Sequence, residues 1–431
     1  MKSYGAFIRE QRPLLAFGLL LTLASSFGQT FFISLFLPDI TREFELSSQA
    51  FGTLYALATL ASGLLLPAAG RWIDRIPLDR FTALVLGGLG ASALLLSRAE
   101  GLVLLAVALF ALRLTGQGLS SHTGLTTMAR YVRAGRGKAL SIASLGFPTG
   151  EAVLPLLVAA ALGVVGWRNL WILAGAIALL GLLPLAQILL RRARVETDPQ
   201  RLAAIRASQE TTGPGELDSS TREDLTSAGG SRPDVPAHRA GWTLSQVLRD
   251  LRFWLLLPAA VLPPFWATGL ILYQSAVAEA RGWTLTLMAS AFVSFAAARV
   301  VFSLVAGPGI DRWSARTLFP WAVIPMGGGV LFLALGSAPW IAFVYMGLLG
   351  TSLGVSSNVK TALWAELYGT SHLGAIKSLD GGIMVLSTAA ASLFVGTLVE
   401  APGGMPQVLW SAVASTGAGW LLALYALRRS R

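Results

Sequence analysis

Long apolar runs dominate this chain and constrain its fold more than any other feature. A helix needs about 20 mostly apolar residues to span the hydrocarbon core of a bilayer. The composition, 54% hydrophobic and 13% charged, is also far from that of a soluble domain, in which about a quarter of residues are charged. No alternating pattern typical of a membrane β-barrel is present. We therefore expect an all-α polytopic membrane protein with twelve transmembrane helices, at Pro13–Pro38, Ser48–Ala69, Phe81–Leu96, Gly101–Thr126, Ala139–Val165, Leu170–Leu190, Phe253–Val277, Leu285–Gly307, Leu318–Gly336, Trp340–Ala365, Gly374–Val399 and Gln407–Leu427.

A polar stretch separates these runs into two groups of six. It is rich in glycine, proline, serine and charged residues, so it cannot bury enough apolar surface to order itself. We expect an N-terminal six-helix bundle at 1–190, a flexible cytoplasmic linker at 191–242, and a C-terminal bundle at 243–431. Thr243–Leu251 has apolar residues at helical spacing, which predicts a short interfacial helix before the seventh span.

Lysine and arginine are distributed unevenly between the two sides that twelve spans create. With the N-terminus inside, 25 of the 33 fall on the inner side and four on the outer side. Cytoplasmic loops carry such an excess, which predicts a multi-pass protein of the cell (plasma or inner) membrane with both termini cytoplasmic. The same distribution accounts for the net charge of +11, so we expect no nucleic-acid partner. The four remaining basic residues lie within the apolar runs: Arg113, Arg299, Lys360 and Lys377.

Residue counts and missing motifs exclude several classes of site. There are no cysteines and only three histidines, so we expect no thiol nucleophile, no metal site and no cofactor. The metalloprotease motif H-E-x-x-H, the hydrolase motif G-x-S-x-G and the P-loop are not present in the sequence. We therefore expect neither an enzyme nor an ATP-driven pump.

A short motif, G-x-x-x-D-R, recurs after the second and the eighth span. A glycine lets two helices approach closely, and the acidic residue can accept hydrogen bonds from an arginine or a helix N-terminus. On this motif the chain resembles the major facilitator superfamily, whose signature G-x-L-A-D-R-x-G-R-R is matched in its first half only. The resemblance implies a role in conformational gating for Gly70, Asp74, Arg75, Gly307, Asp311 and Arg312.

The resemblance to this superfamily covers nearly all of the chain. It implies two six-helix bundles related by pseudo-twofold symmetry, a binding site at the membrane midplane, and alternating access. Within the superfamily the chain is similar to the branch of monocarboxylate and oxalate–formate transporters, on Arg299, the lysines of helices ten and eleven, and Arg136–Ala139. In that branch the arginine of helix eight binds the substrate carboxylate, and the resemblance assigns this role to Arg299.

Basic side chains within the apolar runs are the main candidates for a site. An ionisable side chain costs about 2.5–3.5 kcal/mol at the centre of a spanning helix, so each needs a partner or a water-filled cavity. Arg299 has no charged neighbour within several turns of its own helix, so its partner is another helix or a substrate anion. Lys360 follows a polar stretch and either lines a cavity or extends toward the cytoplasm. Lys377 and Asp380 are three residues apart, which favours a local pair or an inner gate.

Glu151 and His122 each leave two interpretations open. Glu151 lies among helix breakers and either exchanges protons or forms a structural ion pair with Arg113 of the neighbouring span. His122 is either a titrating group in the transport path or a hydrogen-bonded structural residue. Polar and aromatic side chains on helices with breakers complete the expected substrate site: Gln29, Trp266, Tyr273 and Asn358.

Together these features predict a secondary transporter that acts as a monomer and moves a small organic anion. The anion, a monocarboxylate or dicarboxylate, would bind Arg299 with Lys360, and a proton or counter-anion would drive transport. The alternative is a proton-driven exporter of hydrophobic or cationic drugs. Such a pocket would favour membrane-embedded acids over bases, whereas the apolar runs hold more basic than acidic residues.

Overall fold

The computed structural model describes residues 4–132, 135–195, 198 and 242–428, and these residues form helices without strands. Eleven helices are long and apolar enough to span a membrane. A twelfth span is formed when the bent pair Phe7–Gly28 and Thr30–Glu43, at 46° to each other, is counted as one. The predicted all-α membrane architecture is therefore confirmed.

The N-terminal half contains six spans, several of them built from more than one helical segment. The first is α1 (Tyr4–Ala24), η1 (Ser25–Gly28), α2 (Thr30–Ile33), η2 (Ser34–Phe36) and α3 (Leu37–Glu43). The next are α4 (Ser48–Gly70) with η3 (Arg71–Asp74), α5 (Leu78–Ser97), and α6 (Leu102–Leu112) with η4 (Arg113–Ser120) and α7 (Ser121–Tyr131). The last two are α8 (Arg136–Ser144) with α9 (Gly146–Val165), and α10 (Trp167–Ala176) with η5 (Ile177–Leu182) and α11 (Leu183–Ala193).

The C-terminal half begins with α14 (Leu244–Arg249), a short helix with a capping box between Thr243 and Gln246. The next elements are α15 (Leu251–Leu272), α16 (Gln274–Arg281) and α17 (Leu285–Trp313). They are followed by α18 (Ala315–Leu318), η6 (Phe319–Val323) and α19 (Ile324–Leu335). The last three spans are α20 (Pro339–Tyr368), α21 (Leu373–Glu400) and α22 (Gly404–Arg428). The predicted helix before the seventh span is thus present, whereas most of the predicted linker at 191–242 lies outside the described residues.

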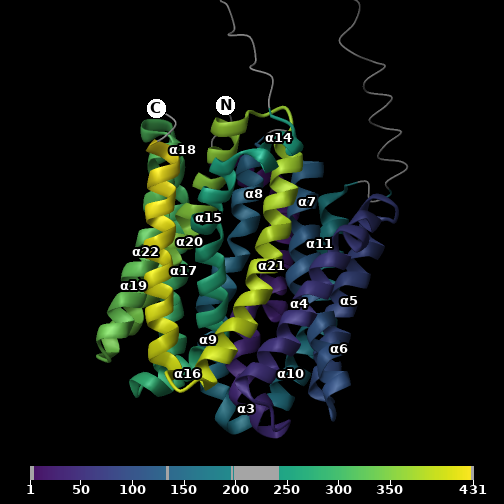
Figure 1. Cartoon of the computed structure of the whole chain (residues 1–431). Coiled ribbons are helices and arrows are strands. Elements are labelled where there is room, and N and C mark those ends of the chain that lie inside the picture. The colour runs from purple at the N-terminus through teal and green to yellow at the C-terminus, as the bar shows by residue number, and fades with distance from the viewer. Residues whose placement is uncertain (1–3, 133–134, 196–197, 199–241, 429–431) are drawn as a thin grey trace, which may run out of the picture.

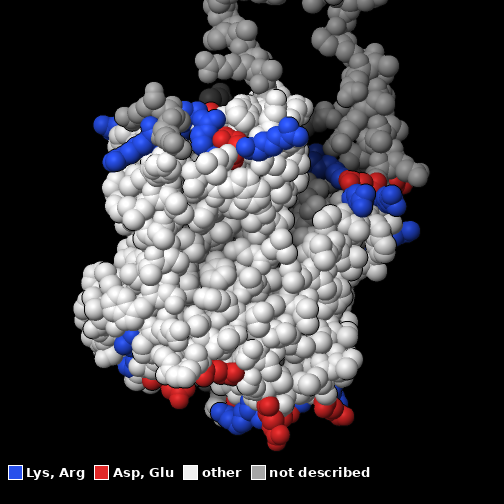
Figure 2. All heavy atoms as spheres, in the orientation of Figure 1, with Lys and Arg blue, Asp and Glu red and all other residues white. Residues whose placement is uncertain are grey.

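Both ends of the chain lie at one end of the helical bundle, together with α8, α14 and α18 (Figure 1). The opposite end carries α3, α10 and α16. Figure 2 shows charged side chains confined to the two ends, with many Lys and Arg at the end of the termini and a broad uncharged band between them. Such a band is the surface that a bilayer would cover.

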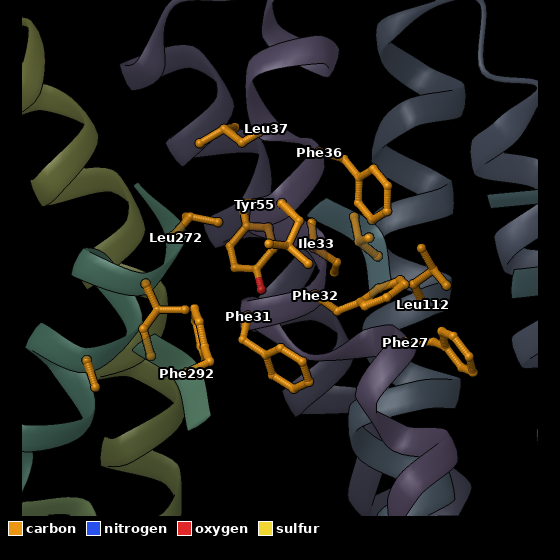
Figure 3. Close-up of a cluster of buried hydrophobic side chains, with 14 of the residues drawn as sticks. Phe27, Phe31, Phe32, Ile33, Phe36, Leu37, Tyr55, Leu112, Leu272 and Phe292 are labelled. Atoms are coloured by element: carbon orange, nitrogen blue, oxygen red, sulfur yellow. The ribbon is translucent and has the colours of Figure 1, made fainter. Parts of the chain in front are cut away.

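The bend in the first span is packed by aromatic side chains. Phe32 contacts Phe27, Phe36 and Trp171 at ring-centroid distances of 5.2, 5.4 and 5.2 Å. In Figure 3, Phe31 lies between Phe32 and Phe292 of α17. The ring centroids of Phe31 and Phe292 are 6.1 Å apart, so the aromatic core continues from the N-terminal half into the C-terminal half. This packing fixes the bent segment at the interface between the halves.

Candidate functional site

A cavity of about 610 Å³ lies between the two halves. The bent first span, η4 and α9 line it on the N-terminal side, through Gln29, Thr30, Phe31, Gln117 and Glu151. Residues of α15, α17, α20 and α21 line it on the C-terminal side. Both halves therefore contribute to one site, as expected for a substrate that contacts two bundles.

The cavity wall holds more positive than negative formal charge. Its charged residues are three basic and two acidic ones: Arg299, Lys360, Lys377, Glu151 and Asp380. The low-dielectric walls of a cleft focus the electric field of its charged residues. An excess of one sign of charge in the wall therefore raises the local concentration of ions of the opposite sign. The excess of positive charge in the cavity wall favours an anion as the ligand.

An ion pair between Arg299 and Glu151 joins the two halves across the cavity. Nη1 of Arg299 on α17 donates to Oε1 of Glu151 on α9. The Glu151 side chain is only 5% exposed, whereas that of Arg299 is 37% exposed and faces the cavity. The guanidinium also lies 6.0 Å from the ring centroid of Phe295, which lines the same wall. The expected partner of Arg299 on another helix is therefore Glu151.

Close helix packing sets the position of each member of this pair. A Cβ at Gly354 of α20 would lie 2.6 Å from the carbonyl oxygen of Arg299, so only glycine lets α17 approach this closely. A Cβ at Gly150 would lie 2.0 Å from Oγ of Ser26, so this side of α9 is pressed against the first span. Glu151, about 100° further round the helix, is thereby turned toward the C-terminal half.

This arrangement corrects the predicted pair of Glu151 with Arg113. Arg113 is 4% exposed and donates through Nη1 to the hydroxyls of Tyr55, at 2.8 Å, and Thr30, at 3.2 Å. Its guanidinium lies 4.9 Å from the Tyr55 ring centroid. The physical reason is the π-helical segment η4, which begins at Arg113 and directs the side chain toward α4 instead of α9.

A second ion pair lies wholly within the C-terminal half. Nζ of Lys360 on α20 is 2.8 Å from Oδ2 of Asp380 on α21, and both side chains are about one-tenth exposed. The expected local pair of Lys377 with Asp380 is therefore wrong. Lys377 is exposed, near the start of α21, and the buried carboxylate is reached by the buried lysine instead. Lys360 lines the cavity, in agreement with the first of its two interpretations.

The remaining predicted substrate-binding residues divide into one that lines the cavity and three that do not. Gln29 lines it, with Nε2 3.4 Å from Oγ of Ser25. The indole of Trp266 is buried and donates to Ser415 at 2.9 Å. Asn358 donates to the carbonyl and hydroxyl oxygens of Ser303, both at 3.0 Å. Trp266 and Tyr273 are therefore corrected, because each side chain points to a neighbouring helix and not into the cavity, whereas Asn358 lines a second hollow beside the cavity.

Tyr273 instead helps to close the end of the cavity that is remote from the termini. Its hydroxyl lies 2.8 Å from the carbonyl oxygen of Ser48 in the N-terminal half and 3.0 Å from that of Ser392 in the C-terminal half. Next to it, Nε2 of Gln274 donates to Oγ of Ser34 at 2.7 Å. At the other end the cavity reaches the exposed Lys377, on the side where the chain ends lie.

The first copy of the repeated motif forms contacts between helices. Asp74 pairs with Arg130 of α7, and Arg130 also donates to the carbonyl oxygen of Ile73 at 3.1 Å. A Cβ at Gly70 would lie 3.2 Å from Nε2 of His122. His122 therefore lies at this motif, away from the residues that line the cavity, and Arg75 is exposed.

The second copy of the motif does not repeat these contacts. A Cβ at Gly307 would meet no atom within 4 Å, so this glycine permits no close approach. Asp311 and Arg312 are exposed, and the Arg312 guanidinium lies 5.2 Å from the Trp313 ring centroid. The helices are joined instead by Glu366, which accepts hydrogen bonds from the backbone amides of Ala315 and Arg316. This corrects the expectation that the motif's glycine permits a close helix approach in the second half as well.

Several cavity residues carry no charge and are not evident from the sequence. They are hydroxyl and amide side chains spread over five helical segments: Thr30, Gln117, Thr268, Ser356, Ser357, Thr361 and Thr388. Single polar residues are frequent in spanning helices, and their spacing alone does not distinguish a cavity wall from a helix contact. The polar stretch before Lys360 and the breakers in the helices of Gln29 and Trp266 indicated cavity-lining spans, but not which of these side chains face the cavity.

Comparison with known proteins identifies the family. The family model of the Major Facilitator Superfamily matches residues 18–274. The chain belongs to this superfamily. Its fold is similar to crystal structures of a bacterial homologue of the human lysosomal transporter Spinster. The inward-facing unoccupied form has a TM-score of 0.65 at 16% identity, covering 97% of both chains. The inward-facing occupied form has a TM-score of 0.62 at 15% identity, covering 99% of this chain and 98% of the other.

One curated relative is similar over part of its length. The fosmidomycin resistance protein of Escherichia coli (strain K12) is 34% identical over 160 residues, which is 35% of this chain and 37% of that protein. The match therefore spans little more than a third of the relative. Members of the major facilitator superfamily are multi-pass transporters that work by alternating access. The cavity between the halves of this chain and the closure at one end fit that mechanism.

Proposed function

We propose that this protein is a secondary transporter of a small organic anion and that Arg299 is the principal anion-binding group. The observation that carries the proposal is the ion pair of Arg299 with Glu151, which spans the halves in the wall of a cavity with three basic and two acidic residues. A guanidinium presents paired donors that match a carboxylate. An anionic substrate can therefore take the place of the Glu151 side chain.

Glu151 gives this site a route to proton coupling. When Glu151 takes up a proton, its attraction to Arg299 weakens and the guanidinium becomes available to the substrate anion. Anion binding and protonation then favour each other, so the affinity for the anion rises as the pH falls. The second cation, Lys360, is held by Asp380 within one half and contributes positive potential to the same cavity.

The direction in which the cavity faces follows from the basic residues. They concentrate at the end of the molecule that holds both chain ends, which the positive-inside rule assigns to the cytoplasm. The hydrogen bonds of Tyr273 and Gln274 then close the outer side, and the cavity faces inward. We propose the cell membrane as the location and the monomer as the working unit.

A second candidate function is drug efflux. It is favoured by the partial similarity to the fosmidomycin resistance protein. A pocket for lipophilic cations would favour an excess of acidic groups, whereas the cavity wall holds three basic and two acidic residues. Export of an anionic compound is compatible with the site described above.

Thermal stabilisation of the purified protein distinguishes these functions. A ligand that binds only the folded state stabilises it by about 2.7 kcal/mol at a concentration of about 100 times its dissociation constant. We expect mono- or dicarboxylates to raise the melting temperature of the wild type, and Arg299→Ala to lose at least about 30-fold in affinity, since truncating one partner of a charged pair costs about 2 kcal/mol or more. Stabilisation by lipophilic cations, unchanged in Arg299→Ala, would favour drug efflux instead.

A further inference from the structure

A second hollow adjoins the central cavity at Arg299. It has a volume of about 610 Å³ and lies between α7, α8 and α9 of the N-terminal half and α17 and α20 of the C-terminal half. Arg299, Leu353 and Ser357 line both spaces, so the two adjoin each other at these residues. We call this second hollow the side groove. The arginine lies at the junction and is accessible from both spaces.

The lining of the side groove differs from that of the cavity. Apart from Arg299, it contains no acidic or basic residue, and its walls are mainly aliphatic or aromatic, as at Leu140, Phe147 and Leu304. Its uncharged polar side chains are four serines and Asn358; the hydroxyls of Ser141 and Ser144 donate to backbone carbonyls of their own helix, and the Asn358 amide donates to Ser303. A wall of this kind suits a hydrocarbon chain.

The side groove reaches the outer surface along the seam between the halves. Leu145 at one edge is 42% exposed and Leu304 at the other is 67% exposed. On α17 the adjacent Val301 and Val305 are also more than half exposed, as expected for a helix face in contact with lipid. The seam therefore gives a ligand a path from the apolar surface to the guanidinium.

We infer that the substrate is a single-chain amphipathic anion, whose charged head binds Arg299 while its hydrocarbon tail lies in the side groove. The inference rests on the anion-binding function proposed above and narrows its substrate class. A small hydrophilic carboxylate would bind in the central cavity alone, and the side groove would then have no ligand. An amphipathic cation would place its charge against Arg299, where like charges repel.

A single cysteine in the groove provides the test, because the chain has no native cysteine. Ser144 lines the side groove but not the central cavity, so Ser144→Cys reports on the tail alone. Ser378→Cys, at an exposed position on α21 outside both spaces, is the matched control. The full-length protein in phospholipid vesicles is labelled with a membrane-permeant maleimide in the presence of dodecanoate, propionate or dodecyltrimethylammonium.

We expect dodecanoate to slow the labelling of Ser144→Cys by about tenfold at a concentration about ten times its dissociation constant. Propionate and dodecyltrimethylammonium should leave the rate unchanged, as should any of the three at Ser378→Cys. Adding Arg299→Ala to Ser144→Cys should abolish the protection, because the tail is held in the groove by its head group.

Three results would overturn the inference. They are no protection by dodecanoate, equal protection by the cation, and protection that survives Arg299→Ala. A cysteine that is already unreactive without dodecanoate would mean that bilayer lipid occupies the groove, which also contradicts the inference. If propionate stabilises the wild type through Arg299 in any of these cases, the proposed function stands and only the substrate class is wrong. If neither carboxylate stabilises the protein, the proposed function itself fails.

Discussion

Two ion pairs in the wall of the same cavity differ in what they connect. Arg299 and Glu151 belong to opposite halves, whereas Lys360 and Asp380 both belong to the C-terminal half. In alternating access the halves move against each other, while each bundle moves largely as a rigid body. The first pair is therefore broken or remade during transport, and the second can persist throughout. A contact between halves reports on the conformational change, and a contact within a half reports on stability.

The largest effect is expected from locking the two halves together at their closed end. The backbone nitrogen of Gln49 is 3.2 Å from Oε1 of Glu400, and these exposed residues lie on opposite halves. In Gln49→Cys/Glu400→Cys, a short bifunctional thiol reagent should reduce uptake to background, because the outer side cannot open. Reduction of the cross-link should restore uptake, which is measured in proteoliposomes.

A matched cross-link within one half serves as the control. Glu43 and Arg168, joined at 2.6 Å, lie at the same end of the molecule but both in the N-terminal half. Cross-linked Glu43→Cys/Arg168→Cys should transport at the rate of the same variant before cross-linking. Equal inhibition of both variants would contradict the distinction between contacts across the halves and within them.

A smaller effect is expected from breaking the pair within the C-terminal half. Removing one member of a buried ion pair leaves an uncompensated charge, which costs about 3–5 kcal/mol in a dry interior. Because Lys360 and Asp380 line a cavity that water can enter, we expect Lys360→Ala to lower the free energy of unfolding by only about 1–2 kcal/mol. Asp380→Asn in the same chain should recover most of this loss, as measured by the melting temperature.

The Lys360–Asp380 pair and Arg299 should also differ in their effect on the affinity for a carboxylate. Lys360→Ala/Asp380→Asn should retain most of the affinity for a carboxylate, since the cavity keeps Arg299 and loses one charge of each sign. If this double variant loses as much affinity as Arg299→Ala, then the two pairs contribute equally and Arg299 is not the principal anion-binding group.

The spans and the polar character of the site could be predicted from the sequence because both depend on local composition. Length and hydropathy identify a membrane helix without knowledge of its neighbours. The rarity of charge in the apolar runs likewise singled out Arg299 and Lys360, and both line the cavity. The breaker and polar residues around Gln29 indicated a kinked first span, but the aromatic packing around Phe32 that holds the bend could not be predicted from the sequence.

Partners of charged residues could not be predicted, because they depend on which helix faces meet. Glu151 and Arg113 lie on adjacent spans, but Gly150 and the π-helical segment η4 rotate the two side chains apart. Asp380 is closer in sequence to Lys377, yet its carboxylate faces Lys360 on α20. In both cases the pair depends on which helix faces meet, which sequence spacing does not show.

The contacts of the repeated motif also depend on residues outside the motif. Gly70 and Gly307 occupy the same position in G-x-x-x-D-R, but only Gly70 packs against another helix. The difference arises from the partner helix, which supplies Arg130 beside Asp74 in the first half and Glu366 beside Ala315 in the second. A sequence repeat predicts the position of an element, whereas its contacts depend on residues elsewhere in the half.

Proton uptake on anion binding tests the central claim, that a substrate anion replaces Glu151 as the partner of Arg299. Calorimetric titration of a carboxylate in two buffers with different heats of ionisation measures the protons bound per anion. We expect the wild type to take up to about one proton per anion, with an affinity that rises by up to about tenfold for each unit of falling pH. Glu151→Gln should bind the anion without proton uptake and without this pH dependence. Equal proton uptake by the wild type and Glu151→Gln, or none by the wild type, would contradict the account.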